Sequence, residues 1–389
     1  MRTGVKTCLC LLLLGAMTLG LLFGCGGEKS TAVEATGPEW NTLAVLRQVP
    51  LSHADQFTLT EYDQGFTLLD IPTSGRFLIV PEGAGLPRGL DADIVPLYAP
   101  LDRIYLTATS SMDFFRALDS IPAVRLSGTD ANGWYIEEAR AALERGDMIF
   151  AGKYSAPDYE LIFSEKCDLA VESTMIYHSP EVKEQLEKLG VPVLVERSSY
   201  EEDPLGRMEW VKVYGALLGK LDQAEALFDG EVKAVEPLLD QPRTDKTVAF
   251  FYITTTGTVN VRKSSDYVPR MIRLAGGDYV FSDLNSGSAL STVNMTMESF
   301  YDGARDADLL IYNSTIDGEL FTLSELLQKS AFLKDFKAVQ TGNVWCTGKN
   351  LFQEPMGLGK LILDMHRVLT DENAPEELTY LHKLTDGGK

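Results

Sequence analysis

Residues 203–240 read DPLGRMEWVKVYGALLGKLDQAEALFDGEVKAVEPLLD, and this stretch decides the fold. Its apolar residues recur at steps of three and four, which predicts two consecutive helices with no strand between them. Asp203 and Pro204 suit the start of the first helix, as N-cap and first-turn residues. Gly219 ends that helix, and Pro242 ends the second. At about 1.5 Å per residue the second helix spans roughly 27 Å, about the width of a small domain.

Short apolar strands alternate with helices on both sides of this stretch. We predict strands before it within residues 104–108, 124–127, 148–151, 167–171 and 191–195, and after it within 248–253, 258–262, 278–281, 309–312 and 343–346. Such alternation is typical of parallel sheets covered by helices on both faces. The prediction is therefore an α/β fold in which a single long helix joins two lobes. A small β meander at residues 57–80 precedes the first lobe's alternation.

The chain divides into five segments on this interpretation. They are a signal peptide at 1–24, a flexible tether at 25–40, an N-terminal lobe at 41–203, a helix pair at 204–242 that contains the inter-lobe helix, and a C-terminal lobe at 243–389. The tether assignment follows from its small and polar residues.

Composition limits the classes of partner. The 389 residues are 45% hydrophobic, enough to bury a sizeable core, and the formal net charge is −21. A nucleic-acid surface needs basic patches, so this charge argues against nucleic-acid binding. The acidic balance indicates solubility and self-repulsion more than any specific partner.

The N-terminus has the pattern of an export signal. Arg2 and Lys6 precede an apolar run at residues 7–23, and Leu22-Phe23-Gly24-Cys25 follows. A small residue before a cysteine resembles a bacterial lipoprotein signal, in which cleavage before Cys25 leaves the thiol to carry a lipid. The alternatives are an uncleaved anchor or a plain signal peptide, but the run is short for a spanning helix of about 20 residues. We therefore expect a protein held by lipid on the outer face of the cytoplasmic membrane.

Cysteine and histidine provide no metal site in the sequence. Cleavage would leave Cys25, Cys167 and Cys346, of which the last two fall in or beside apolar strand-like runs in different halves of the chain. A disulfide between them stays open, but two buried free thiols are favoured. There is no CxxC pair, and the four histidines are scattered.

Four segments, in order, carry a resemblance to a known family. They are Ile104-Tyr-Leu-Thr-Ala-Thr-Ser-Ser-Met-Asp-Phe-Phe, then Gly152-Lys-Tyr-Ser-Ala-Pro-Asp-Tyr-Glu-Leu-Ile with Lys166-Cys-Asp-Leu-Ala, then Leu274-Ala-Gly-Gly-Asp-Tyr-Val-Phe, then Met297-Glu-Ser-Phe with Asp306-Ala-Asp-Leu-Leu-Ile. The chain resembles the substrate-binding lipoproteins of ABC importers for ferric siderophores, haem and cobalamin, the class III family with a helical backbone. The resemblance covers nearly the whole chain after residue 40. It implies two Rossmann-like lobes joined by one rigid helix, with a ligand cleft between them.

The resemblance also implies how the protein meets its transporter. In that family one surface glutamate per lobe docks onto basic residues of the permease, and the matching positions are Glu160 and Glu298. Two anionic points, one on each lobe, would steer the encounter and report the relation of the lobes. The alternative is that each glutamate is only a favourable charge in a first helical turn.

Candidate ligand-binding residues lie in the loops after the strands, because ligands of open α/β sheets bind beyond the strands' carboxyl ends. Arginine makes forked hydrogen bonds to carboxylate or catecholate oxygens, and tyrosine offers a flat apolar face with a polar tip. For each candidate the alternative is a local turn residue, a helix cap or a partner of an acid. Trp134, Tyr177 and Trp345 are weaker candidates that suit a wall or core. The candidates are Tyr154, Ser155, Arg197, Tyr200, Arg262, Asn313 and Lys349.

The predicted function is capture without catalysis. The protein would bind a metal chelate, first of all a ferric siderophore, and deliver it to an ABC permease and its ATPase. Haem, with Tyr154, Tyr177 or His178 as axial ligand, and a corrinoid stay open as ligands. A ligand-sensing lipoprotein is a second alternative. An extracytoplasmic enzyme is disfavoured, because GxSxG, GxxxxGK[ST] and strand-linked GxGxxG motifs are absent from the sequence. We expect no cofactor or metal of the protein's own, a monomer, and only modest closure of the lobes.

Overall fold

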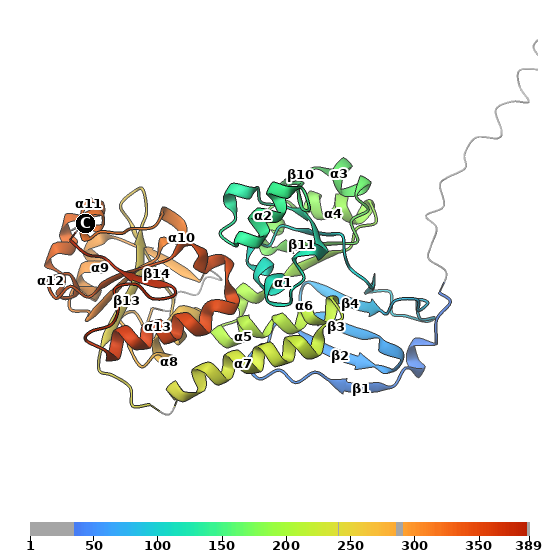
Figure 1. The fold of residues 1–389 in the computed structure, drawn as a ribbon, viewed down its shortest axis with the longest axis horizontal. Coiled ribbons are helices and arrows are strands. Elements are labelled where there is room, and N and C mark those ends of the chain that lie inside the picture. The colour runs from blue at the N-terminus through green and yellow to red at the C-terminus, as the bar shows by residue number, and fades with distance from the viewer. Residues whose placement is uncertain (1–34, 240, 285–290, 387–389) are drawn as a thin grey trace, which may run out of the picture.

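Two lobes lie side by side along the long axis of the molecule. The computed structural model describes residues 35–239, 241–284 and 291–386. The N-terminal lobe is blue and green in Figure 1, the C-terminal lobe is orange and red, and yellow-green helices run between and beneath them. The two-lobed α/β architecture predicted from the sequence is therefore confirmed.

The N-terminal lobe begins with a sheet of its own. Its strands are β1 (Val45–Gln48), β2 (Thr58–Tyr62), β3 (Thr67–Ile71), β4 (Gly75–Val80) and β5 (Ile94–Tyr98), in spatial order 1-2-3-4-5. The first four form an antiparallel meander, and β5 lies parallel to β4. The meander predicted at residues 57–80 corresponds to β2–β4. Gly65 (φ +83°) and Gly75 (φ +135°) take conformations that favour glycine at its turns.

The second sheet of this lobe is parallel throughout, in the order β12-β11-β6-β7-β8. Successive residues of β11 face different clusters: Leu169 and Val171 join the main core, and Ala170 joins a second cluster on the other face. Both faces are covered, as the apolar strands predicted. The elements are β6 (Ile104–Leu106), α1 (Met112–Ala117), β7 (Val124–Ser127), α2 (Glu137–Arg145), β8 (Ile149–Phe150), the hairpin β9 (Gly152–Lys153) and β10 (Ala156–Pro157), α3 (Tyr159–Ser164), β11 (Leu169–Ser173), α4 (Pro180–Lys188) and β12 (Val193–Glu196).

The central stretch forms α5 (Pro204–Glu209), α6 (Val211–Leu217) and α7 (Leu221–Leu239). The Asp203 carboxylate accepts a hydrogen bond from the Leu205 backbone N–H (3.0 Å), and Gly219 is left-handed (φ +67°), so the predicted cap and stop are confirmed. The first predicted helix differs in being divided at Trp210. The indole of Trp210 is buried and donates to Glu201 (2.8 Å). In Figure 1 the chain passes from the first lobe to the second through α7.

The C-terminal lobe has a mixed seven-stranded sheet in the order β16-β14-β13-β17-β18-β19, with β15 also beside β13. Strands β13, β15, β17 and β18 are parallel, and β14, β16 and β19 run antiparallel to their neighbours. The predicted strands are present, while β16 and β19 were not predicted. The elements are β13 (Thr247–Ile253), β14 (Val259–Arg262), α8 (Tyr267–Leu274), β15 (Asp278–Tyr279), β16 (Thr292–Met295), α9 (Met297–Ala304), β17 (Leu309–Tyr312), α10 (Ser314–Asp317), α11 (Leu323–Lys329), α12 (Lys337–Gln340), β18 (Val344–Thr347), α13 (Leu358–Thr370) and β19 (Leu381–Lys383).

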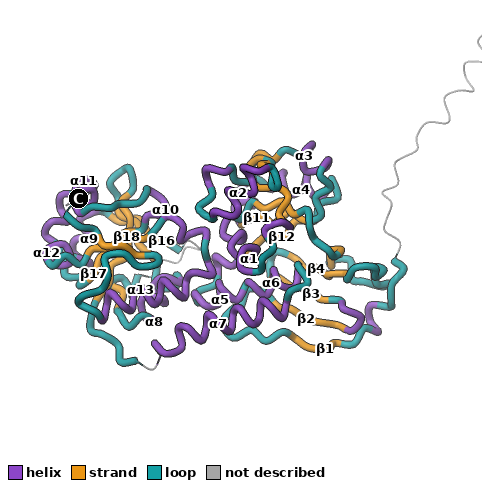
Figure 2. The backbone as a smooth tube through the Cα atoms, viewed as in Figure 1, coloured by secondary structure: helices purple, strands orange, loops and turns teal. Residues whose placement is uncertain are grey.

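One hydrophobic core runs through the joint between the lobes. It includes Phe57 of the N-terminal region, Trp210 and Tyr214 of the central stretch, Phe250 of β13 and Leu361 of α13. Helix α13 packs on both α5 and α7. The strands of the two lobes remain separate sheets with helices between them (Figure 2). The joint is therefore a packed helical layer and not a shared sheet.

The two cysteines of the described lobes do not pair. Cys167 and Cys346 are both buried and free. Burial raises the pKa of each thiol to about 12, so both are neutral thiols at ordinary pH. The expectation of two buried free thiols is confirmed.

Candidate functional site

Segments that follow the carboxyl ends of parallel strands in the two lobes contact one another. The segment after β6, η3 (Thr109–Ser111), contacts the segment after β18, η9 (Lys349–Gln353), and α1 contacts the following η10 (Pro355–Gly357). Loops from both lobes therefore meet at the position where ligands of open α/β sheets bind.

Gln353 joins the lobes at the floor of this site. Its side-chain oxygen accepts from the Tyr135 backbone N–H (2.8 Å), and its amide nitrogen donates to the Gly133 carbonyl (2.8 Å). Beside this amide, the Tyr135 and Phe352 rings meet edge to face, with centroids 5.9 Å apart. The side chain is buried, so these two bonds are sheltered from water. Gln353, Tyr135 and Phe352 were not among the predicted site residues, because the candidates chosen from the sequence were arginine, tyrosine and other polar residues close to the predicted strand ends.

A buried ionic cluster forms a second joint. The Asp113 carboxylate of α1 accepts from Arg116 Nε (2.9 Å) and from the Met356 backbone N–H of the other lobe (2.8 Å). Arg116 lies 3.8 Å from Glu354, which accepts from the Tyr380 hydroxyl (2.6 Å). Burial raises the pKa of Asp113 to about 6, against the opposing effect of Arg116. The lobes are thus held by paired polar groups as well as by the core.

Several exposed apolar side chains lie at or after the carboxyl ends of strands in the two lobes. Of the weaker candidates, Tyr177 is 46% exposed, whereas Trp134 is buried in the core. Large apolar side chains that gather on a surface mark a binding site more often than chance exposure does. The set is Tyr135, Phe150, Met175 and Tyr177 from the N-terminal lobe and Ile316 and Phe352 from the C-terminal lobe.

The predicted residues of the first lobe fall at opposite edges of its sheet. Tyr154 and Ser155 form the turn between β9 and β10, just beyond β8, whereas Arg197 and Tyr200 follow β12. Strands β8 and β12 lie roughly 19 Å apart, since neighbouring strands are about 4.8 Å apart. Arg197 and Tyr200 do come together, with the guanidinium 4.3 Å from the ring centroid. Arg197 also approaches the Gln56 side-chain oxygen (3.3 Å), so part of its donor capacity is used locally.

The predicted residues of the second lobe have three different environments. Arg262 is carried away from the carboxyl edge, because β14 runs antiparallel to β13, and it pairs with Asp266 (3.4 Å). Asn313 is buried and caps α10 by accepting from Thr315 (2.8 and 3.2 Å). Lys349 opens η9 where the lobes touch, is half-buried, and has no ion pair within residues 35–239, 241–284 and 291–386. Of the three, Lys349 lies best for an anionic ligand.

Glu160 and Glu298 hold matching places in the two lobes. Each is the second residue of its helix, after an N-cap side chain that accepts from the helix: Asp158 from Leu161 (3.0 Å) and Thr296 from Ser299 (3.2 Å). Both carboxylates are exposed and unpaired in the part of the chain that the structure describes. They are therefore available to a partner.

Glu172 is a buried acid close to the site. It lies near the carboxyl end of β11, accepts a hydrogen bond from the Thr107 hydroxyl, and its other oxygen has no partner among the described residues. Burial raises its pKa to about 8. It therefore carries its proton at neutral pH.

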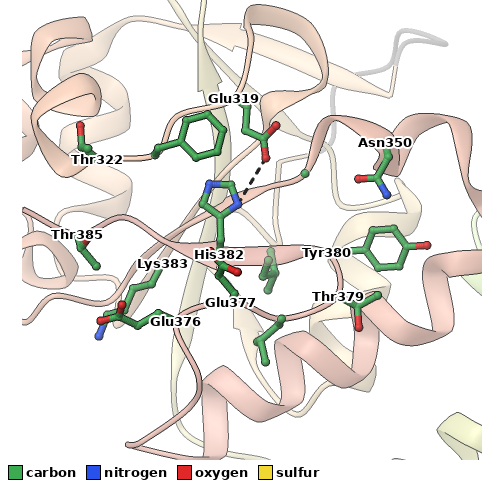
Figure 3. Close-up of a pocket in the computed structure, with 14 residues that line it drawn as sticks. Glu319, Thr322, Asn350, Glu376, Glu377, Thr379, Tyr380, His382, Lys383 and Thr385 are labelled. Carbon is green, nitrogen blue, oxygen red and sulfur yellow. Dashed lines mark ion pairs between the residues drawn. The ribbon is translucent and has the colours of Figure 1, made fainter. Parts of the chain in front are cut away.

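A pocket of about 900 Å³ lies next to this joint but wholly within the C-terminal lobe. Its wall includes His382, which lies 3.6 Å from Glu319 and stacks on Phe321 (Figure 3). Asn350 and Tyr380 line its other side. Because one lobe supplies all its residues, this pocket is separate from the inter-lobe cleft that the sequence predicted. No group of three or more His, Cys, Asp or Glu side chains suited to a metal ion occurs among the described residues.

Fold and site together define a two-lobed solute-binding protein. A family model described as periplasmic binding protein matches residues 106–351, more than half of the chain. The chain belongs to the periplasmic binding protein family, and solved structures that share its fold include periplasmic haem-binding and vitamin B12-binding proteins. Members of this family bind and deliver solutes, so the protein is not an enzyme. The sheet β1–β5 lies outside the matched residues.

Relatives and solved structures agree with this assignment. Two uncharacterised lipoproteins of Methanocaldococcus jannaschii are 25% and 24% identical, over 95% and 96% of this chain and 94% and 99% of theirs. A periplasmic haem-binding protein of Pseudomonas aeruginosa has a TM-score of 0.57 at 17% identity, covering 74% of this chain and 99% of that one. A possible iron-binding protein of Staphylococcus epidermidis has a TM-score of 0.55 at 15% identity, covering 69% and 99%. At these identities the structures establish the fold alone.

Proposed function

We propose that this protein is an extracytoplasmic lipoprotein that captures a metal chelate between its lobes and delivers it to an ABC permease and its ATPase. The main support is the contact between the segments after β6 and β18, which lies near the exposed rings of Tyr135 and Phe352 and near Lys349, a residue with no ion pair among the described residues. The names of the two Methanocaldococcus jannaschii relatives support lipid attachment, for which Cys25, outside the described residues, is the candidate. None of the described helices has the length and apolar character needed to span a bilayer.

A ferric siderophore is the first candidate ligand. An anionic ferric chelate is favoured, because Lys153, Arg197 and Lys349 place positive charge after three strands of the two lobes. Haem or a corrinoid is the second candidate, because the rings of Tyr135, Tyr177 and Phe352 offer apolar surface to a flat macrocycle. A lipoprotein that senses its ligand without transporting it is the remaining alternative.

A titration tests the ligand class. The mature chain from Cys25 on is titrated with ferric siderophores, haemin and cobalamin, and tryptophan fluorescence is followed, since Trp134 adjoins Tyr135 in the sequence. One class should change the fluorescence and saturate. Tyr135→Ala should weaken that binding at least tenfold, because its exposed ring lies where the two lobes meet. Phe321→Ala, an equally simple loss of an exposed ring in the separate pocket, should leave it within twofold. No response to any of the three would contradict the proposal of a metal chelate.

Delivery is tested with purified ABC permease–ATPase complexes that import ferric siderophores, haem or cobalamin. The loaded protein should stimulate ATP hydrolysis and uptake into proteoliposomes. Glu160→Gln and Glu298→Gln should each slow association with the complex, most strongly at low salt, because they remove charges that steer the encounter. Absence of stimulation by the wild type would favour the sensing alternative.

A further inference from the structure

Each lobe exposes a phenylalanine beside its candidate docking glutamate. Phe163 follows Glu160 by three residues in α3, so both lie on one face of that helix, and its ring is 65% exposed. Phe332 in η8 (Ala331–Asp335) is 64% exposed and lines a hollow of about 460 Å³ together with Glu298. Exposure on this scale leaves either ring little to contribute to the fold.

The two surfaces occupy equivalent places in the two lobes. Helix α3 leads into β11, which pairs with the lobe's first parallel strand β6, and α9 leads into β17, which pairs with β13. The acids at the start of these strands do the same work: Asp168 accepts from the Asp102 and Arg103 N–H groups (3.0 Å each), and Asp308 accepts from Thr247 (2.8 Å). The two glutamates therefore hold matching sites, and an exposed ring accompanies each of them, from α3 itself in the first lobe and from η8 in the second.

We infer that Phe163 and Phe332 are aromatic anchors of the permease-docking surface, each seated in an apolar recess bordered by basic residues. The inference rests on the proposed delivery to a permease. Aromatic side chains dominate binding energy at interfaces when water is excluded around them, whereas rim charges act mainly on association. The glutamates therefore speed association with the permease, and the aromatic rings slow dissociation from it.

The charges around the rings favour a permease over the lipid surface. Glu298, Asp302 and Asp335 border the hollow at Phe332, and Asp158 and Glu160 lie near Phe163. Anionic lipid headgroups would repel both surfaces, while a recess with basic borders complements them.

The test uses the permease–ATPase complex that the wild type stimulates, in nanodiscs, and the mature chain with Cys25→Ser so that no lipid tethers it. Phe163→Ala and Phe332→Ala should each raise the dissociation rate about tenfold and leave the association rate within twofold. Glu160→Gln and Glu298→Gln should slow association and leave the dissociation rate nearly unchanged. Phe321→Ala is the matched control, because it removes an equally exposed ring from the C-terminal lobe away from α9. Unchanged melting temperatures and ligand affinities establish that each variant is folded.

The outcomes separate the two proposals. If both phenylalanine variants dissociate within twofold of the wild-type rate while the glutamate variants associate more slowly, the rings are not anchors. The proposed delivery to a permease would then still stand. Failure of the wild type to bind the complex would overturn delivery itself. Binding of the wild type to protein-free vesicles of anionic lipid, lost in the phenylalanine variants, would also overturn the anchors, because the rings would then serve the membrane.

Discussion

Glu172 shows how burial alone sets the charge of a side chain near the cleft. Its folded-state pKa of about 8 lies above the ordinary 4.5, because the carboxyl has left water for an apolar layer with one hydroxyl partner. The folded chain therefore keeps a proton that the unfolded chain releases above pH 4.5. Stability from this group is fully present below pH 4.5 and is lost as the pH rises to about 8.

Glu172→Gln should remove this pH dependence. The neutral amide keeps the shape, so the variant should lie near wild type at pH 5 and be more stable by a few kcal/mol, at most about 5, at pH 9. Urea unfolding at the two pH values measures the difference. Glu160→Gln, which removes an exposed carboxylate of the same lobe, should stay within about 0.5 kcal/mol of wild type at both. An equal Glu172→Gln effect at pH 5 and 9 would contradict the assigned shift.

Single residues were predictable where their cause is local. Asp203 caps a helix through the backbone N–H of Leu205, which lies within the first turn, and Pro204 is the first residue of that helix, as predicted. Arg262 follows a strand in the sequence, but the antiparallel direction of β14 places it away from the carboxyl edge, and direction depends on a partner strand far along the chain. Gln353 gave no local signal at all, since its two bonds reach residues about 220 positions earlier.

At the scale of elements, α6 and α7 pack closely enough to require a glycine. A Cβ atom at Gly215 would lie 2.5 Å from the Ala224 Cβ and 3.1 Å from the Lys220 carbonyl oxygen and the Leu221 Cα. Backbone atoms supply two of these three contacts, so rotamer changes cannot relieve them. This close approach brings the inter-lobe helix against the first lobe.

Gly215→Ala should therefore destabilise the protein by about 1–3 kcal/mol through overpacking. Gly230→Ala is the matched control, because Gly230 lies on the exposed face of α7 with open space around it. That substitution should stabilise by about 0.5–1 kcal/mol, since alanine is the better helix former. Thermal or urea unfolding measures the stability of both variants. A Gly215→Ala variant as stable as Gly230→Ala would show that α6 and α7 can move apart to admit the extra methyl group.

Element type was predictable where the hydrophobic period was long or repeated. The hydrophobic pattern of the sequence predicts the alternation of apolar strands and helices. Each predicted strand corresponds, within a few residues, to a strand of the structure. Strands β1, β5, β16 and β19 were missed because each is short or half-exposed, and β5 also contains Pro96. Their strand character comes from a neighbour in space, which no local pattern reports.

At the scale of the molecule, three kinds of contact resist motion between the lobes. They are the core that runs from Phe57 to Leu361, the two hydrogen bonds of Gln353, and the buried cluster around Asp113. Packed cores do not deform continuously, and α7 offers no strand hinge. Ligand binding should therefore leave the arrangement of the two lobes largely unchanged.

Solution scattering on the mature chain with Cys25→Ser tests this. Addition of saturating ligand should leave the radius of gyration unchanged within error, because closure would have to break the shared core. Gln353→Ala removes the two hydrogen bonds but leaves that core, so it should also show no change in radius, with or without ligand. If Gln353→Ala alone expands, the hydrogen bonds and not the core hold the lobes. A large compaction of the wild type on ligand addition would contradict the rigid joint and make α7 one part of a hinge.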